Sequence, residues 1–164
     1  MAYIYKQLKL KTFGFIPLIL LFFIAFNGNS IIDFTLFSIN VTYILVYFWV
    51  LRKPQSLGYG FIFLAGIITD ILYGLPLGAN ALALLFIAAV AAYVRVVTVR
   101  VTLVTDWISF FPAILISNAV YFLSLYFSDY SIDYFFLLKD SIFTFLFYPI
   151  MWSFFSLILN LTKS

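Results

Sequence analysis

Cysteine, histidine and glutamate are absent from this chain of 164 residues, and all six of its acidic residues are aspartates. Without cysteine the chain can form no disulfide and has no thiol nucleophile. Without histidine it lacks the commonest general base, and it has few of the ligands that hold zinc or haem. Charged residues make up 9% of the chain, whereas a soluble domain carries about a quarter. The low content of charged residues excludes a water-soluble fold. Because the usual ligand residues are missing, we expect neither a metal nor a cofactor.

Hydrophobic residues make up 66% of the chain, and its net charge is +3. The basic residues stand in short clusters between apolar runs and form no continuous stripe, which favours a lipid bilayer over nucleic acid as the surrounding partner. A spanning helix needs about 20 mostly apolar residues. The sequence predicts an all-α membrane protein, a single domain over residues 1–164 with six spanning helices. The expected spans are residues 13–26, 34–51, 57–73, 77–96, 107–127 and 141–161.

The start of the chain also resembles a signal peptide, because lysines precede an apolar run. Bulky Ile24 and Phe26, however, occupy the positions where cleavage requires small residues. We therefore expect an uncleaved anchor.

The distribution of charge predicts the orientation of the spans. With six spans, eight of the nine cations fall on one side: Lys6, Lys9, Lys11, Arg52, Lys53, Arg95, Arg100 and Lys163. The other side holds one cation and most of the acids: Lys139, with Asp33, Asp70, Asp129, Asp133 and Asp140. Basic loops are retained in the cytoplasm, so both termini are predicted to be cytoplasmic.

Polar residues near the expected helix starts are candidate caps. Asp33 is expected to cap the second helix, Thr105 or Asp106 the fifth, and Asp140 or Ser141 the sixth.

Three prolines and one aromatic segment also bear on the helices. Pro17 is compatible with a first helical turn, whereas Pro112 and Pro149 lie deeper and are expected to kink their helices. The segment Tyr130–Asp140 is aromatic but interrupted by charge, and we expect it to lie along the outer interface.

A cluster of polar residues and helix breakers joins the third and fourth expected helices. Asp70 lies about one turn before Gly74, which suits the left-handed end of a helix, and Pro76 suits the first position of the next. The N–H groups that open this next helix, at residues 77–79, attract a carboxylate, and Asn80 adds side-chain donors. The pattern predicts a helical hairpin that Asp70 holds together across the turn; a role toward a partner or ligand is the alternative.

The fourth expected helix carries a face of small residues. Ala81, Ala88 and Ala92 share this face at helical spacing, with Ala79 and Ala83 beside it. Small faces allow membrane helices to approach closely. We expect this face to pack within the chain, with a partner protein as the alternative.

The segment GIITDILYGLPLGANALAL, residues 66–84, resembles the signature of the MreD family, the rod-shape-determining membrane proteins of bacteria. In that family an acid ends one helix and a Gly-x-Pro-Leu-Gly turn leads into an Ala/Leu-rich helix. The segment LVYFWVLRKP, residues 45–54, resembles the aromatic helix end, basic pair and proline of the same family. Asp70, Gly74, Pro76, Gly78 and Asn80 match signature positions. The motifs cover residues 45–92, and the last two helices match in character alone.

The resemblance implies a non-enzymatic, multi-pass protein of the bacterial inner membrane that is needed for rod shape and lateral peptidoglycan synthesis. It implies MreC as a partner, within a complex that contains RodA, a class B penicillin-binding protein and the MreB filament. It also implies a six-helix fold related to the substrate-binding subunits of energy-coupling-factor vitamin transporters. No catalytic residue is carried over.

Two other functions remain open. The chain could be the substrate-binding membrane subunit of a vitamin or small-molecule transporter, although its outer loops have few of the polar groups that such a ligand needs. It could also be an enzyme acting on a lipid-linked substrate through Asp70 with Asp129 or Asp133. The lack of a neighbouring base argues against this reaction.

Overall fold

The computed structural model of the protein describes residues 15–27, 39–98, 102–130 and 134–161, and it confirms the all-helical fold class. These residues form six α-helices and the short 3-10 helix η2, Pro54–Ser56. The α-helices are α2 (Ile16–Asn27), α3 (Val41–Arg52), α4 (Tyr59–Tyr73), α5 (Ala79–Val97), α6 (Leu103–Phe127) and α7 (Tyr134–Leu161).

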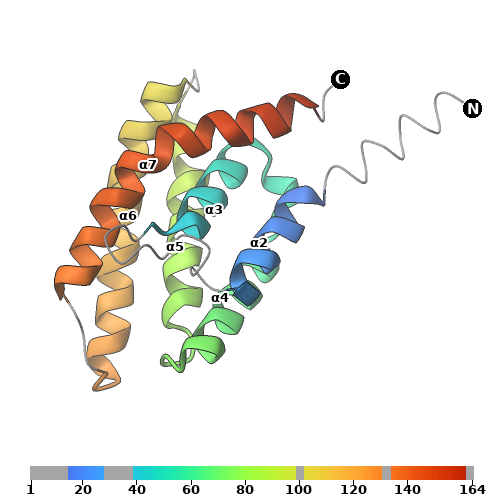
Figure 1. Ribbon diagram of the computed structural model, residues 1–164. Helices are drawn as coiled ribbons and strands as arrows, with labels where there is room; N and C mark the ends of the chain where they lie inside the picture. Colours follow the sequence, from blue (N-terminus) through green and yellow to red (C-terminus); the bar gives the residue numbers. More distant parts are fainter. Residues whose placement is uncertain (1–14, 28–38, 99–101, 131–133, 162–164) are drawn as a thin grey trace, which may run out of the picture.

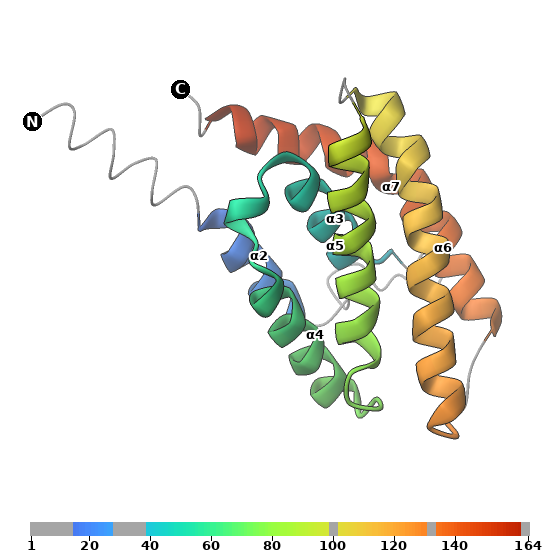
Figure 2. The same cartoon turned by 180° about the vertical axis from the view of Figure 1, so that it is seen from behind.

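Helix α3 lies at the centre of the molecule (Figures 1 and 2). Every residue from Thr42 to Leu51 is buried, and α3 packs against α2, α5 and α7. Helices α4 and α6 pack against opposite sides of α5, since each has extensive contacts with it. The α4–α5 turn and the C-terminal end of α6 lie at the lower end in Figure 1, and α3 and α7 end at the upper end.

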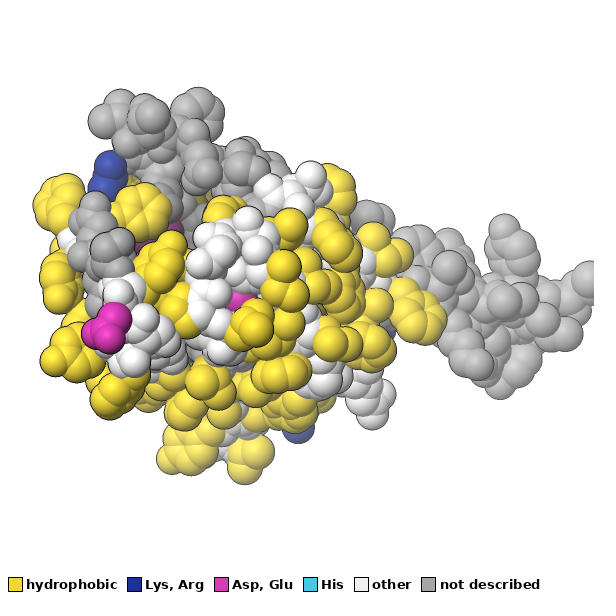
Figure 3. All heavy atoms as spheres, turned by 90° about the horizontal axis from the view of Figure 1, so that it is seen from below, with side chains coloured by type: hydrophobic (Ala, Val, Ile, Leu, Met, Phe, Trp, Pro, Cys, Tyr) yellow, Lys and Arg dark blue, Asp and Glu magenta, His cyan; other side chains and the backbone are white. Residues whose placement is uncertain are grey.

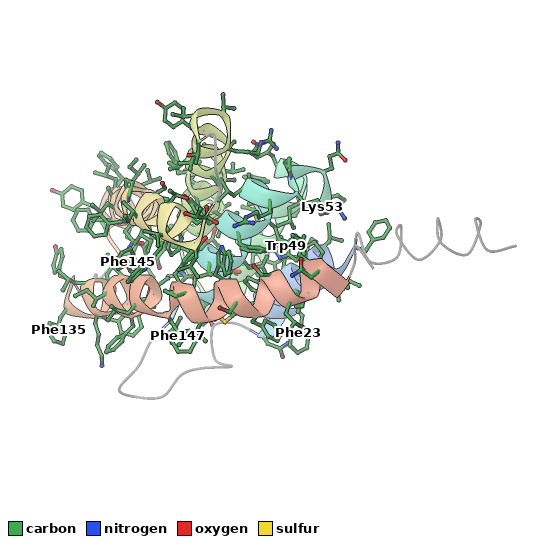
Figure 4. All side chains as sticks on the ribbon, turned by 90° about the horizontal axis from the view of Figure 1, so that it is seen from above. Phe23, Trp49, Lys53, Phe135, Phe145 and Phe147 are labelled. Atoms are coloured by element: carbon green, nitrogen blue, oxygen red, sulfur yellow. The ribbon has the colours of Figure 1, made fainter. Side chains whose placement is uncertain are left out.

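Helices α5, α6 and α7 are long and apolar enough to cross a membrane, over Ala79–Val97, Leu103–Phe127 and Tyr134–Asn160. The other three α-helices are apolar but shorter. Hydrophobic side chains dominate the described surface seen from the lower end (Figure 3). Trp49 points into the bundle, whereas Phe23 and Phe135 lie at its periphery (Figure 4). The chain is thus apolar outside as well as inside, as a lipid environment requires.

The second expected helix starts later than predicted. Ile39 and Asn40 are not helical, and α3 begins at Val41. The Asn40 side chain accepts a hydrogen bond from the Tyr43 N–H at 3.1 Å, and the Asn40 N–H donates to Thr144 Oγ1 on α7 at 2.8 Å. A capping side chain competes with helix continuation, so the apolar run does not set this boundary. Asp33, the expected cap, lies outside the described residues.

The last two helices start earlier than predicted, and their expected caps are wrong. Thr102 caps α6: its side chain accepts from the Thr105 N–H, and the Thr105 side chain bonds back to the Thr102 N–H. Asp106 and Ser141 both lie inside helices. Helix α7 begins at Tyr134, so Tyr134–Asp140 is helical and continuous with the last expected span.

Pro17 and Pro149 behave as their depth in each helix predicts. Pro17 lies in the first turn of α2, where the missing N–H has little effect. Pro112 and Pro149 lie inside α6 and α7. Helix α7 bends visibly near its middle, where Pro149 removes a helical hydrogen bond (Figures 1 and 2).

Candidate functional site

Asp70 joins helices α4 and α5 at the lower end of the bundle. Its side chain is fully buried. Oδ2 accepts from the Gly78 N–H at 2.9 Å, and Oδ1 accepts from both the N–H and the side-chain Nδ2 of Asn80 at 3.0 Å. These donors belong to the start of α5, where unpaired N–H groups carry partial positive charge. The carboxylate uses both oxygens, and it holds the hairpin together as the sequence predicted.

The turn between these helices depends on two glycines with positive φ. Gly74 ends α4 at φ 63°, and the Leu75 N–H bonds the Asp70 carbonyl at 2.9 Å, as in a Schellman-type helix end. Gly78 precedes α5 at φ 100°, a value that other residues rarely adopt. Pro76 does not occupy the first helical position expected for it. Its carbonyl instead accepts from the Ala79 N–H, because the Gly78 conformation delays the helix start to Ala79.

The small residues predicted to form one face of α5 lie inside the bundle. Ala81 and Ala88 are fully buried, and Ala92 is partly buried. Ala81 meets Gly66 of α4 so closely that a Cβ placed on Gly66 would lie 2.3 Å from the Ala81 Cα. This contact brings the two backbones together just inside the Asp70 turn, and two short side chains therefore set the spacing of the hairpin.

A second polar cluster, at the upper end, joins α3, α6 and α7. Arg52 Nη2 donates to Asp106 Oδ2 at 2.8 Å, and Trp152 Nε1 donates to the same oxygen at 3.0 Å. The Arg52 guanidinium also lies over the rings of Phe48 and Trp152, 5.7 and 5.3 Å from their centroids. The Asp106 side chain is 1% exposed. A carboxylate buried in a membrane protein requires such a partner, and the pair fixes the upper ends of three helices relative to one another.

This ion pair was not predicted from the sequence, where Asp106 is a candidate helix cap. A signal was nevertheless present: of the six aspartates, Asp106 alone falls among the cations of the basic side. A lone acid beside a helix-terminal arginine is a candidate for a buried pair. The sequence does not show which of several cations pairs with Asp106, because Arg52 and Asp106 are 54 residues apart.

The candidate site residues divide into two groups. Asp70, Gly74, Pro76, Gly78, Asn80 and Ala81 form or flank the hairpin turn, whereas Ala88 and Ala92 lie further along α5.

The aspartates considered for catalysis are not brought together in the described residues. Asp129 is exposed after the end of α6, whereas Asp70 is buried. Asp133 lies outside the described residues. Within the described ranges, no three acidic side chains are close enough to hold a metal ion.

Comparison of the chain with family models, with curated proteins and with solved structures finds no match.

Proposed function

We propose that this chain is a non-enzymatic scaffold of the MreD type, a multi-pass protein of a bacterial inner membrane with both termini in the cytoplasm. In this role it binds MreC and, through the same complex, RodA, a class B penicillin-binding protein and the MreB filament. It supports rod shape and lateral peptidoglycan synthesis. A relationship in fold to the substrate-binding subunits of energy-coupling-factor transporters is part of the same proposal.

The main support is the conformation of the motif that carries the resemblance. The only charged side chain of residues 66–84, Asp70, is buried and bonded to Gly78 and Asn80. The residues around the turn that remain exposed are apolar: Leu72 is 54% exposed and Leu77 is 73% exposed. A turn that is held rigid and exposes apolar side chains suits contact with another membrane protein, because close packing drives such association.

The charges at the two ends support the orientation. Arg52, Lys53 and Arg95 lie near the ends of α3 and α5, which are at the upper end (Figures 1 and 2). Asp129 follows α6 at the lower end, near the Asp70 turn. With basic residues retained in the cytoplasm, the upper end faces the cytoplasm and the hairpin turn faces outward.

The experiment is a detergent pull-down of the tagged full-length chain from its native membrane, with mass spectrometry of both proteins and small molecules. The test variants Leu72→Ala and Leu77→Ala shorten exposed side chains at the turn. Ile108→Ala and Leu157→Ala are matched controls, since these residues are 64% and 59% exposed on α6 and α7. We expect MreC with the wild type and both controls, and reduced MreC with the turn variants.

Other results would contradict the proposal. Recovery of an ATPase-coupled membrane subunit, or of a vitamin in stoichiometric amount, would identify the transporter subunit instead. Recovery of MreC in equal amounts with all four variants would show that the hairpin turn is not the contact. Loss of an enzymatic activity on Asp70→Asn, with MreC binding intact, would contradict the non-enzymatic role.

A further inference from the structure

An apolar groove of about 510 Å³ runs between α6 and α7 in the lower half of the bundle. At its upper end the ring of Phe145 contacts Phe111, with centroids 5.4 Å apart. At its lower end Phe122 contacts Tyr134, with centroids 5.6 Å apart. Figure 4 shows Phe145 on the side of α7 that faces α6. Aromatic pairs therefore close the groove at both ends, and it opens sideways.

The polar groups that line the groove are largely bonded to one another. Asn118 Nδ2 donates to Ser141 Oγ at 2.6 Å, and Ser141 Oγ donates to the Leu137 carbonyl at 2.7 Å. The rims are aliphatic: Leu115 is 53% exposed and Ile142 is 51% exposed. The lining therefore favours a hydrocarbon occupant over a polar metabolite.

The length of the groove matches that of one lipid chain. Its lining runs from Phe111 to Phe122 along α6, a length of about 17 Å at 1.5 Å per residue. The hydrocarbon core of a bilayer is about 30 Å thick, so the acyl chains of one leaflet span about 15 Å. A transmembrane helix spans about 30 Å and would extend beyond the aromatic pairs at the two ends of the groove, whereas one acyl chain lies between them.

One cation stands beside the groove. Lys139 lies one helical turn before Ile142, so its side chain shares a helix face with this rim residue. Lys139 is partly exposed, and a lysine can extend its ammonium group to the membrane interface. Its charge is complementary to a lipid phosphate.

We propose that this groove binds one acyl chain of an anionic phospholipid whose phosphate pairs with Lys139. The proposal requires that α6 and α7 lie in a membrane, and it is independent of any contact with MreC. The lipid would fill the space between the lower halves of α6 and α7 and would stabilise their spacing.

The test is native mass spectrometry of the full-length chain in detergent, titrated with phosphatidylglycerol or with phosphatidylcholine of the same acyl chains. We expect one tightly bound lipid, with about a fivefold preference for phosphatidylglycerol, the ratio that one lysine near an anionic surface supplies. Lys139→Gln should abolish this preference and retain chain binding. Lys53→Gln, at the opposite end of the bundle, should leave the preference unchanged.

The groove itself is tested with two matched tryptophans on α7. Ile142→Trp fills the groove, whereas Ile150→Trp places the same side chain on an equally apolar position, 58% exposed, outside it. Ile142→Trp should weaken binding of both lipids at least tenfold, and Ile150→Trp should have no effect. If Ile142→Trp does not fold, Leu115→Trp fills the groove from α6.

Three results would overturn the proposal: equal lipid binding by the two tryptophan variants, equal affinity of the wild type for the two lipids, or a second copy of the chain bound in place of lipid. Because no partner protein is present, failure here would not affect the proposed scaffold function.

Discussion

Gly66 of α4 and Ala81 of α5 are in backbone contact: a Cβ on Gly66 would lie 2.3 Å from the Ala81 Cα and 2.6 Å from its nitrogen. Neither atom can move without moving its helix. The separation of the α4–α5 hairpin is therefore set by a missing side chain, one turn from the carboxylate that closes it.

The first prediction follows from this contact. Gly66→Ala should force the two helices apart and lower stability by about 1–3 kcal/mol, the usual cost of overpacking. Gly60→Ala is the matched control on the same helix, because a Cβ there would meet nothing within 4 Å; it should gain about 0.5–1 kcal/mol from helix propensity. Thermal unfolding in detergent, followed by circular dichroism, measures both. Equal unfolding midpoints for the two variants would refute the close contact.

The second prediction concerns the acceptor capacity of Asp70. Asparagine offers one acceptor oxygen and replaces the other with a donor, which would face the Gly78 or Asn80 N–H. Asp70→Asn should therefore cost about 1–3 kcal/mol, the penalty of a buried unsatisfied group. Asn80→Ala removes one side-chain bond and keeps the backbone bond, so it should cost about 1 kcal/mol. The same unfolding measurement ranks the variants, and an Asp70→Asn protein as stable as the wild type would contradict the geometry.

The third prediction concerns the ion pair at the upper end. Asp106→Leu leaves Arg52 without its anion and Trp152 without its acceptor. It should lower the free energy of unfolding by about 3 kcal/mol or less, because the Arg52 side chain is 21% exposed and can reach water. Arg52→Met leaves the charge of the buried Asp106 without a partner, so it should lower the free energy of unfolding more than Asp106→Leu does. The double variant should be more stable than Arg52→Met alone, because it removes both charges.

A double-mutant cycle from the same unfolding curves gives the coupling between the two residues. Arg95→Met is the control for loss of a cation, since Arg95 is exposed near the end of α5. Additive effects of Arg52→Met and Asp106→Leu would show that the pair does not form.

The fourth prediction concerns orientation and uses the absence of cysteine. Gln55 is exposed in η2 after α3, and Leu77 is exposed in the α4–α5 turn. With a membrane-impermeant maleimide applied to spheroplasts of a host that lacks MreC, Leu77→Cys should react from outside, and Gln55→Cys should react only after permeabilisation. The reverse pattern would invert the orientation, and labelling of both from outside would contradict the six-span arrangement.

The sequence predicted the hairpin correctly because its determinants are local. Asp70, Gly74, Gly78 and Asn80 lie within one short segment, and helix-end chemistry constrains them strongly. The start of α3 was predicted wrongly because the prediction followed the apolar run, whereas the Asn40 side chain caps the helix by accepting from the Tyr43 N–H. The predicted start of α7 was also wrong. The charged residues Lys139 and Asp140 were expected to interrupt the helix, but α7 includes both of them.

The sequence by itself determined the helical class, the lipid environment and the turn at Asp70. Composition and local backbone preferences suffice for these features. The tertiary structure alone decided which residues meet across the bundle: Arg52 with Asp106, Gly66 with Ala81, and the faces of α6 and α7 that form the groove. The physical reason is that a helix in lipid is apolar on its outer and inner faces alike, so hydrophobic periodicity does not indicate which face packs, and shape and a few polar side chains decide it.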